Sequence, residues 1–106
     1  MIAEIIVDVT SSEVDKVFDY ICDENYLLGQ RVLVPFGNRK IEGYIINVKD
    51  NSSYEYSKLK SVIKPLDDYA VITKEMLELS RFMIKKYNLR IIDTLRLFLP
   101  AGIRGD

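Results

Sequence analysis

The sequence predicts a small α+β domain, with a curved sheet or partial barrel of about five strands followed by a C-terminal helical hairpin. Three observations lead to this prediction. β-branched and aromatic residues recur in strand-like runs within residues 1–66. Gly37-Asn38 separates two strand-like runs. From Thr73 onward, apolar residues recur at helical spacing. Because the strands come first and the helices last, the two kinds of element should pack as separate parts, 1–66 and 73–99.

The first two elements differ in how clearly the pattern defines them. Ile2–Val9 is rich in β-branched residues and predicts a strand. In the next segment, Ser12 can cap a helix whose apolar residues at 14, 17, 18 and 21 follow helical spacing. Val17–Cys22 also suits a short strand. Periodicity leaves both interpretations of residues 12–22 open.

The middle of the chain predicts a hairpin and one further strand. Gln30–Phe36 and Lys40–Val48 are the two arms, because Gly-Asn between them suits a tight turn. Gly43 within the second arm indicates a bulge or a bend. The polar segment Asp50–Ser57 predicts a surface loop, and Lys58–Leu66 should form the fifth strand.

Two helices should close the chain. The first spans 73–88, with Thr73 as its N-cap and lysines at its C-terminal end. The second, Ile91–Leu99, is stopped by Pro100. We expect the first helix to pack through one apolar stripe. The stripe consists of Met76, Leu79, Met83 and Tyr87.

Length and composition restrict the function classes. A chain of 106 residues suits one domain, and it lacks the apolar run of about 18 residues that a membrane span needs. We therefore expect a cytoplasmic protein without membrane partners. There is no histidine, and Cys22 is the only cysteine, so the sequence argues against a bound metal, an internal disulfide and a catalytic triad. An independent enzyme is therefore disfavoured, and Cys22 suits a buried apolar position.

Charge is unevenly distributed along the chain. The net charge is -1, yet residues 29–64 carry seven basic and three acidic side chains. If hairpins bring the basic residues together they form one patch for phosphates; otherwise they are separately solvated surface charges. The seven residues are Arg31, Arg39, Lys40, Lys49, Lys58, Lys60 and Lys64.

Four segments together carry a resemblance to a known family. They are Phe18-Asp19-Tyr20, the Gly29–Arg39 run with its Pro-Phe-Gly turn, Gly43, and Leu59-Lys60-Ser61-Val62 followed by Leu66-Asp67. In these segments the chain resembles the N-terminal 3′ DNA-binding domain of primosomal protein N′, the replication-restart helicase PriA. The resemblance favours an extended conformation at 17–22. It also implies a fragment of a longer bacterial, nucleoid-associated helicase, in which ATP and zinc belong to other domains and this fragment holds no cofactor.

The resemblance further implies a site and its partners. The domain should bind branched DNA by taking the 3′-hydroxyl end of a nascent strand into a small pocket, and the parent chain should meet other primosome proteins and single-stranded DNA-binding protein. Asp19 would accept a hydrogen bond from the terminus, and Lys60 would lie near the last phosphate. The pocket residues implied are Phe18, Asp19, Tyr20, Gly37 and Lys60, with further phosphate contacts at Arg31, Arg39 and Lys40.

Each of these residues also has a purely structural interpretation. Phe18 and Tyr20 share one strand face, so at least one face of the strand belongs to the core. Residue type favours the core for Phe18, whereas Tyr20 can bury its ring and still present its hydroxyl. Asp19 and Lys60 can be surface charges, and Gly37 can simply form the turn.

A different function class also fits the composition. Exposed aromatic side chains favour protein interfaces, so the domain could instead dock another replisome protein. The aromatic residues considered for that surface are Tyr44, Tyr54 and Tyr56.

Overall fold

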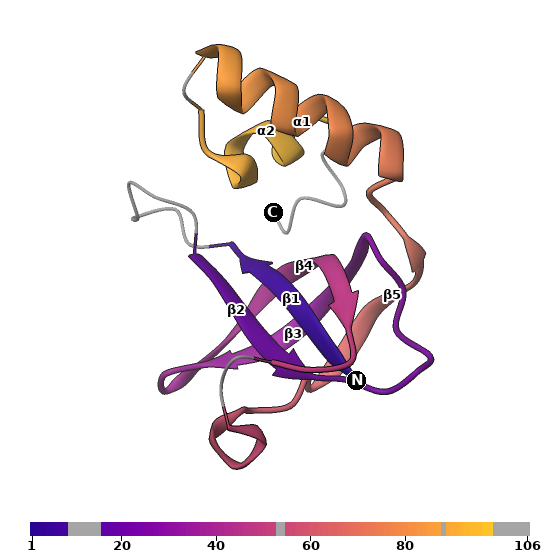
Figure 1. Cartoon of the computed structure of the whole chain (residues 1–106), viewed down its shortest axis with the longest axis vertical. Helices are drawn as coiled ribbons and strands as arrows, with labels where there is room; N and C mark the ends of the chain where they lie inside the picture. Colours follow the sequence, from indigo (N-terminus) through magenta and orange to yellow (C-terminus); the bar gives the residue numbers. More distant parts are fainter. Residues whose placement is uncertain (9–15, 53–54, 88, 99–106) are drawn as a thin grey trace.

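The computed structural model describes residues 1–8, 16–52, 55–87 and 89–98 (Figure 1). The predicted α+β class is confirmed: five strands form one antiparallel sheet in the order β2-β1-β4-β3-β5, and two helices follow. The strands are β1 (Ile2–Val7), β2 (Lys16–Ile21), β3 (Gln30–Phe36), β4 (Arg39–Lys49) and β5 (Lys64–Ala70). The remaining elements are a 3-10 turn, η1 (Tyr56–Lys58), and the helices α1 (Lys74–Tyr87) and α2 (Ile91–Phe98).

β1 lies near the middle of the sheet and is buried on both faces. Because side chains alternate along a strand, Ile5 points into one apolar cluster and Ile6 into another. The first cluster fills the inside of the curved sheet, and the second joins the sheet to the helices. Figure 1 shows the two helices together on one side of the sheet. Burial on both faces explains why β1 is apolar almost throughout.

The hairpin predicted at Gly37-Asn38 is confirmed. Phe36 pairs with Arg39, so the turn between β3 and β4 has two residues. Gly37 has a φ of 59°, the left-handed conformation that glycine adopts without strain. The turn therefore sets the register that places Pro35 opposite Lys40.

The extended interpretation of the second segment is also confirmed where the structure describes it. Lys16–Ile21 forms the edge strand β2, which pairs with β1 only on one side. Residues 12–15, including the expected cap Ser12, lie outside the described residues. The other edge of β2 contacts the segment before β5: the Ile21 amide donates to the Lys60 carbonyl, and the Val62 amide donates to the Ile21 carbonyl, both at 2.9 Å.

The fifth strand lies later in the chain than Lys58–Leu66. Its pairing with β3 shifts in register between Gln30 and Val32, and Asp67 lies within this irregular part. There Arg31 donates to the Asp67 carboxylate at 2.8 Å, and the Gln30 side-chain amide donates to the Asp67 carbonyl at 2.7 Å. Lys60 and Val62 bond to β2 instead, and the Ile63 amide donates to the Leu33 carbonyl of β3 at 2.9 Å. The expected strand boundary was wrong because these polar anchors, rather than apolar alternation, position β5.

Of the bulge or bend expected at Gly43, the bulge occurs elsewhere in β4. Glu4 pairs with Asn47 and Ile5 pairs with Ile45, so the extra residue of the bulge is Ile46. Gly43 instead permits close packing, because a Cβ there would lie 2.5 Å from Cγ2 of Ile5.

The apolar stripe expected on α1 was wrong in part. Thr73 caps the helix as predicted, with its Oγ1 accepting from the Met76 amide at 3.1 Å. Leu77 and Ser80 are the buried residues, whereas Leu79 and Tyr87 are 47% and 58% exposed. Ser80 can be buried because its hydroxyl donates to the Met76 carbonyl at 2.8 Å. Hydrophobicity alone could not reveal that a serine is buried on this helix.

Tyr44, proposed for an exposed interface, is fully buried between the sheet and the helices. The structure therefore contradicts its use as a docking residue. Tyr54 and the side chain of Tyr56 lie outside the described part of the chain. Within that part, no helix is both long enough and apolar enough to span a bilayer.

Two glycines with positive φ allow a matched test of how much close backbone packing contributes to stability. Gly29 has a φ of 85°, and a Cβ there would lie 1.9 Å from the Ile72 carbonyl oxygen. Gly37 also has positive φ, but open space surrounds it. We expect Gly29→Ala to lower the free energy of unfolding by about 3 kcal/mol or more. We expect Gly37→Ala to lower it by only about 1–2 kcal/mol. Urea unfolding measures both, and equal losses would contradict this account.

Candidate nucleic-acid interface

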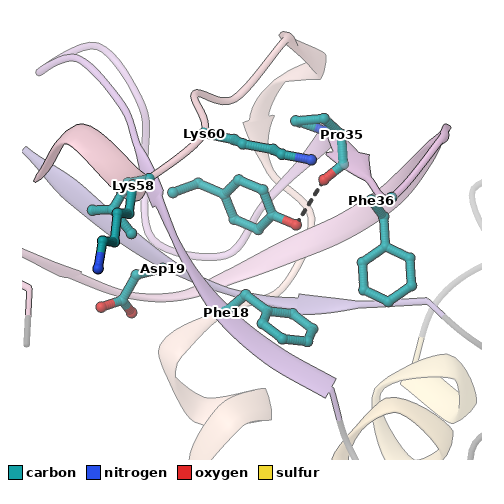
Figure 2. A pocket seen from close by; sticks show the side chains of 9 residues that line it. Phe18, Asp19, Pro35, Phe36, Lys58 and Lys60 are labelled. Carbon is teal, nitrogen blue, oxygen red and sulfur yellow. Dashed lines mark hydrogen bonds between the residues drawn. The ribbon is translucent and has the colours of Figure 1, made fainter. Parts of the chain in front are cut away.

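A cavity of about 430 Å³ opens between β2, the end of β3 and the segment after η1 (Figure 2). Its volume is in the range of small-ligand sites. All five residues that the family resemblance implied for a pocket line this cavity, although they come from three distant parts of the chain. The complete lining is Phe18, Asp19, Tyr20, Pro35, Phe36, Gly37, Lys58, Leu59 and Lys60.

Tyr20 forms the inner wall of the cavity. Its side chain is 5% exposed and belongs to the core inside the sheet. The hydroxyl donates to the Pro35 carbonyl at 2.9 Å, and burial raises the pKa of this phenol above its ordinary value. Tyr20 therefore links β2 to β3 across the cavity, and its hydroxyl is already engaged.

Two phenylalanines form an apolar side of the cavity. Phe18, whose residue type favours the core, is 41% exposed. Its ring centroid lies 5.6 Å from that of Phe36, with the ring planes at 56°. Phe36 is half-buried and packs against the core. The pair thus presents a supported aromatic surface, against which a flat apolar group such as a nucleobase can stack.

The Asp19 carboxylate points away from Pro35 and Phe36 (Figure 2). Asp19 pairs with Glu4, so their side chains share a face. Lys49 Nζ lies 3.1 Å from Asp19 Oδ2 and 3.2 Å from Glu4 Oε1, and Ser52 Oγ also donates to Asp19 Oδ2. Hydrogen bonding to Asp19 is the main cause of a raised Lys49 pKa. The Asp19 side chain is only 7% exposed.

Asp19 also contributes its main chain to the cavity side of β2. The main-chain groups of Ile21 point away from β1, because they bond to Lys60 and Val62. In an antiparallel pair this direction alternates, so the N–H and C=O of Asp19 point the same way as those of Ile21. Outside the strand pairing, these two groups make no backbone–backbone hydrogen bond within the described residues. One donor and one acceptor therefore remain available on this edge.

Two lysines supply positive charge to the cavity. The Lys60 carbonyl is fixed by its bond to the Ile21 amide, and its side chain is exposed. Lys58 is also exposed, and its contact with Glu55 is a loose one of 3.8 Å between side chains that are each 74% exposed. Such a surface pair contributes little, so Lys58 can turn toward an anion. The sequence placed Lys58 in the basic patch but not in the pocket.

The three arginine and lysine residues expected to contact phosphate fall outside the cavity lining. Arg31 is paired with Asp67 and lies 3.7 Å from Glu42, and its side chain is 14% exposed, so it ties β3 to its neighbours. Arg39 and Lys40 are exposed at the start of β4, opposite Phe36 and Pro35. They therefore lie near the rim, whereas Arg31 is committed to the fold.

The remaining lining residues lie next to the predicted ones. Pro35 and Phe36 precede Gly37, and Leu59 precedes Lys60. Their adjacency to predicted residues, in the Pro-Phe-Gly and Leu-Lys segments, was the sequence signal that could have identified them as lining residues. Two further cavities, of about 130 and 350 Å³, adjoin Asp23 and Tyr26 and have no lysine or arginine in their lining. No group of three or more potential metal-ligating side chains occurs among the described residues.

Comparisons with known proteins give a consistent result. A family model described as the 3′ DNA-binding domain (3′BD), named for PriA, matches residues 4–100. The chain is 37% identical over 107 residues to replication restart protein PriA of Bacillus subtilis, with 97% of this chain covered. It is 30% identical over 92 residues to replication restart protein PriA of Haemophilus influenzae, with 85% covered. The chain spans 13% of the length of each relative.

Two tyrosine hydroxyls differ in whether they have a partner. The Tyr20 hydroxyl bonds to Pro35, whereas the buried Tyr44 hydroxyl has no hydrogen-bond partner within the described structure. We expect Tyr20→Phe to lower the free energy of unfolding by about 1 kcal/mol. Tyr44→Phe, as the matched control, should leave it unchanged or raise it slightly, because no hydrogen bond is lost. Thermal unfolding at pH 7 measures both variants. A larger loss of stability for Tyr44→Phe than for Tyr20→Phe would contradict the assignment of the hydrogen bond to Tyr20.

Proposed function

The chain belongs to the family of 3′ DNA-binding domains of the replication restart protein PriA, and from this we propose that its cavity binds the terminal nucleotide at the 3′ end of a nascent DNA strand. One observation carries the proposal: residues 18–20, 37 and 60 meet at a single cavity of suitable volume. In a longer protein, this domain would direct ATP-driven unwinding to stalled or branched forks.

The cavity combines groups that suit the two parts of a nucleotide. Phe18 and Phe36 offer a surface for the base, and Lys58 and Lys60 offer charge for the phosphate. The main-chain edge at Asp19 adds a donor and an acceptor for the base edge or the terminal hydroxyl. Specificity for a strand end follows because a nucleotide inside a continuous strand is joined to a further nucleotide and could not be placed in the cavity in the same way.

The low net charge of the chain is compatible with this mode of binding. Proteins that coat DNA neutralise many phosphates and need a strongly basic surface. A site for one terminal nucleotide needs one or two cations, together with stacking and hydrogen bonds. A chain of net charge -1 with two lysines at the cavity meets that requirement.

The proposal is tested with forks that differ only at the nascent end. We expect the 106-residue chain to bind a fork ending in a 3′-hydroxyl about tenfold or more tighter than the same fork ending in a 3′-phosphate, because a terminal hydrogen bond is lost and charge is added. A fork without a nascent strand should bind as weakly as the phosphate-ended one. Fluorescence anisotropy at fixed salt measures all three, and equal affinities would refute end recognition.

Lys60→Ala gives a residue-level check in the same assay. Removal of one phosphate contact should weaken binding regardless of the terminal base and lower the salt slope by about one. Lys64→Ala is the matched control, because Lys64 is exposed but does not line the cavity. Equal effects of the two variants would remove Lys60 from the site.

A further inference from the structure

The segment between β4 and β5 is attached to β2 at two points. Near its start, Ser52 Oγ donates to the carboxylate of Asp19. Near its end, the Lys60 carbonyl accepts from the Ile21 amide at 2.9 Å. Asp19 and Ile21 are two residues apart on one edge strand. The attachments therefore lie on either side of Lys58 and Leu59, which line the cavity.

The attachment at Asp19 is stronger than an ordinary surface ion pair. Exposed pairs contribute little because water screens both partners. Here the Asp19 side chain is 7% exposed, and its Oδ2 atom accepts from both Ser52 and Lys49. Lys49 also pairs with Glu4, so β1, β2 and β4 all contribute to the cluster. A charge-assisted bond in such a setting has well-defined geometry.

The same contacts orient the carboxylate itself. With Oδ2 occupied by two donors, Oδ1 is the oxygen that accepts no hydrogen bond within the described chain. Any ligand donor that reaches this carboxylate must therefore use Oδ1, in an orientation set by Lys49 and Ser52. Lys49 and Ser52 thus lie outside the cavity lining but set the orientation of the Asp19 carboxylate.

We propose that Lys49 and Ser52 are positioning residues: by fixing the Asp19 carboxylate they hold the segment carrying Lys58 and Lys60 against the cavity. This inference rests on the proposed function for its effect on DNA, but the attachment itself is a property of the free protein. It assigns the Asp19 side chain a role distinct from that of its main chain, as an anchor for the lysines of the cavity.

The first test needs no DNA. Amide hydrogen exchange is followed at Ile21 and Val62, whose hydrogen bonds join β2 to the segment. Loss of one bond to a charged group should raise these exchange rates about tenfold in Ser52→Ala, and similarly in Lys49→Met, relative to the parent. Ser57→Ala is the matched control, an exposed serine on the same segment. Unchanged rates at both amides in both variants would overturn the proposal.

The second test separates positioning from general destabilisation. Ser52→Ala should weaken binding of a 3′-hydroxyl fork roughly three- to tenfold, and Ser57→Ala should not. When Lys58 and Lys60 are both already alanine, adding Ser52→Ala should have no further effect on the affinity, because the lysines it positions are gone. An undiminished effect in that background would contradict positioning.

The two proposals fail in distinguishable ways. If the parent chain does not discriminate between hydroxyl and phosphate ends, the proposed function fails while the exchange measurement still decides the attachment. If the parent discriminates and Ser52→Ala neither weakens binding nor alters exchange, the positioning proposal alone fails.

Discussion

Two backbone hydrogen bonds at Ile21 determine most of what is distinctive about this domain. They join the free edge of β2 to Lys60 and Val62, after the chain has passed through β3, β4 and η1. This contact curves the sheet back on itself and leaves a cavity beside the junction. Because the junction is at residue 21, the strand residues directly before it, 18–20, line the cavity. These three residues thus line a cavity only because the sheet closes.

Because side chains alternate along a strand, residues 18, 19 and 20 contribute to the cavity in different ways. Tyr20 points into the core and links β2 to β3 through Pro35, while Phe18 lies at the cavity rim against Phe36. Asp19 points to the opposite face, where Lys49 and Ser52 hold it, but its main chain faces the cavity side. Support, stacking surface and hydrogen-bonding edge therefore come from consecutive residues, and a shift of one residue in register would exchange them all.

Local signals predicted much of this arrangement, and long-range pairing accounts for the rest. Gly37-Asn38 specified its own hairpin, and Thr73 its own helix cap, because both depend on neighbouring residues. The position of β5 depends on Arg31 reaching Asp67, which no local pattern contains. The ion pair between Asp19 and Lys49 could not be predicted locally either, because Lys49 approaches Asp19 only when β2, β1 and β4 lie in that order.

Binding of a strand end in the cavity is best tested by mapping amide chemical shifts during titration with a short single strand that ends in a 3′-hydroxyl. We expect the largest changes at residues 18–20, 36–37 and 58–60, with little change for a 3′-phosphate strand at equal concentration. Changes concentrated at the cavities around Asp23 and Tyr26, or on the exposed face of α1, would contradict it.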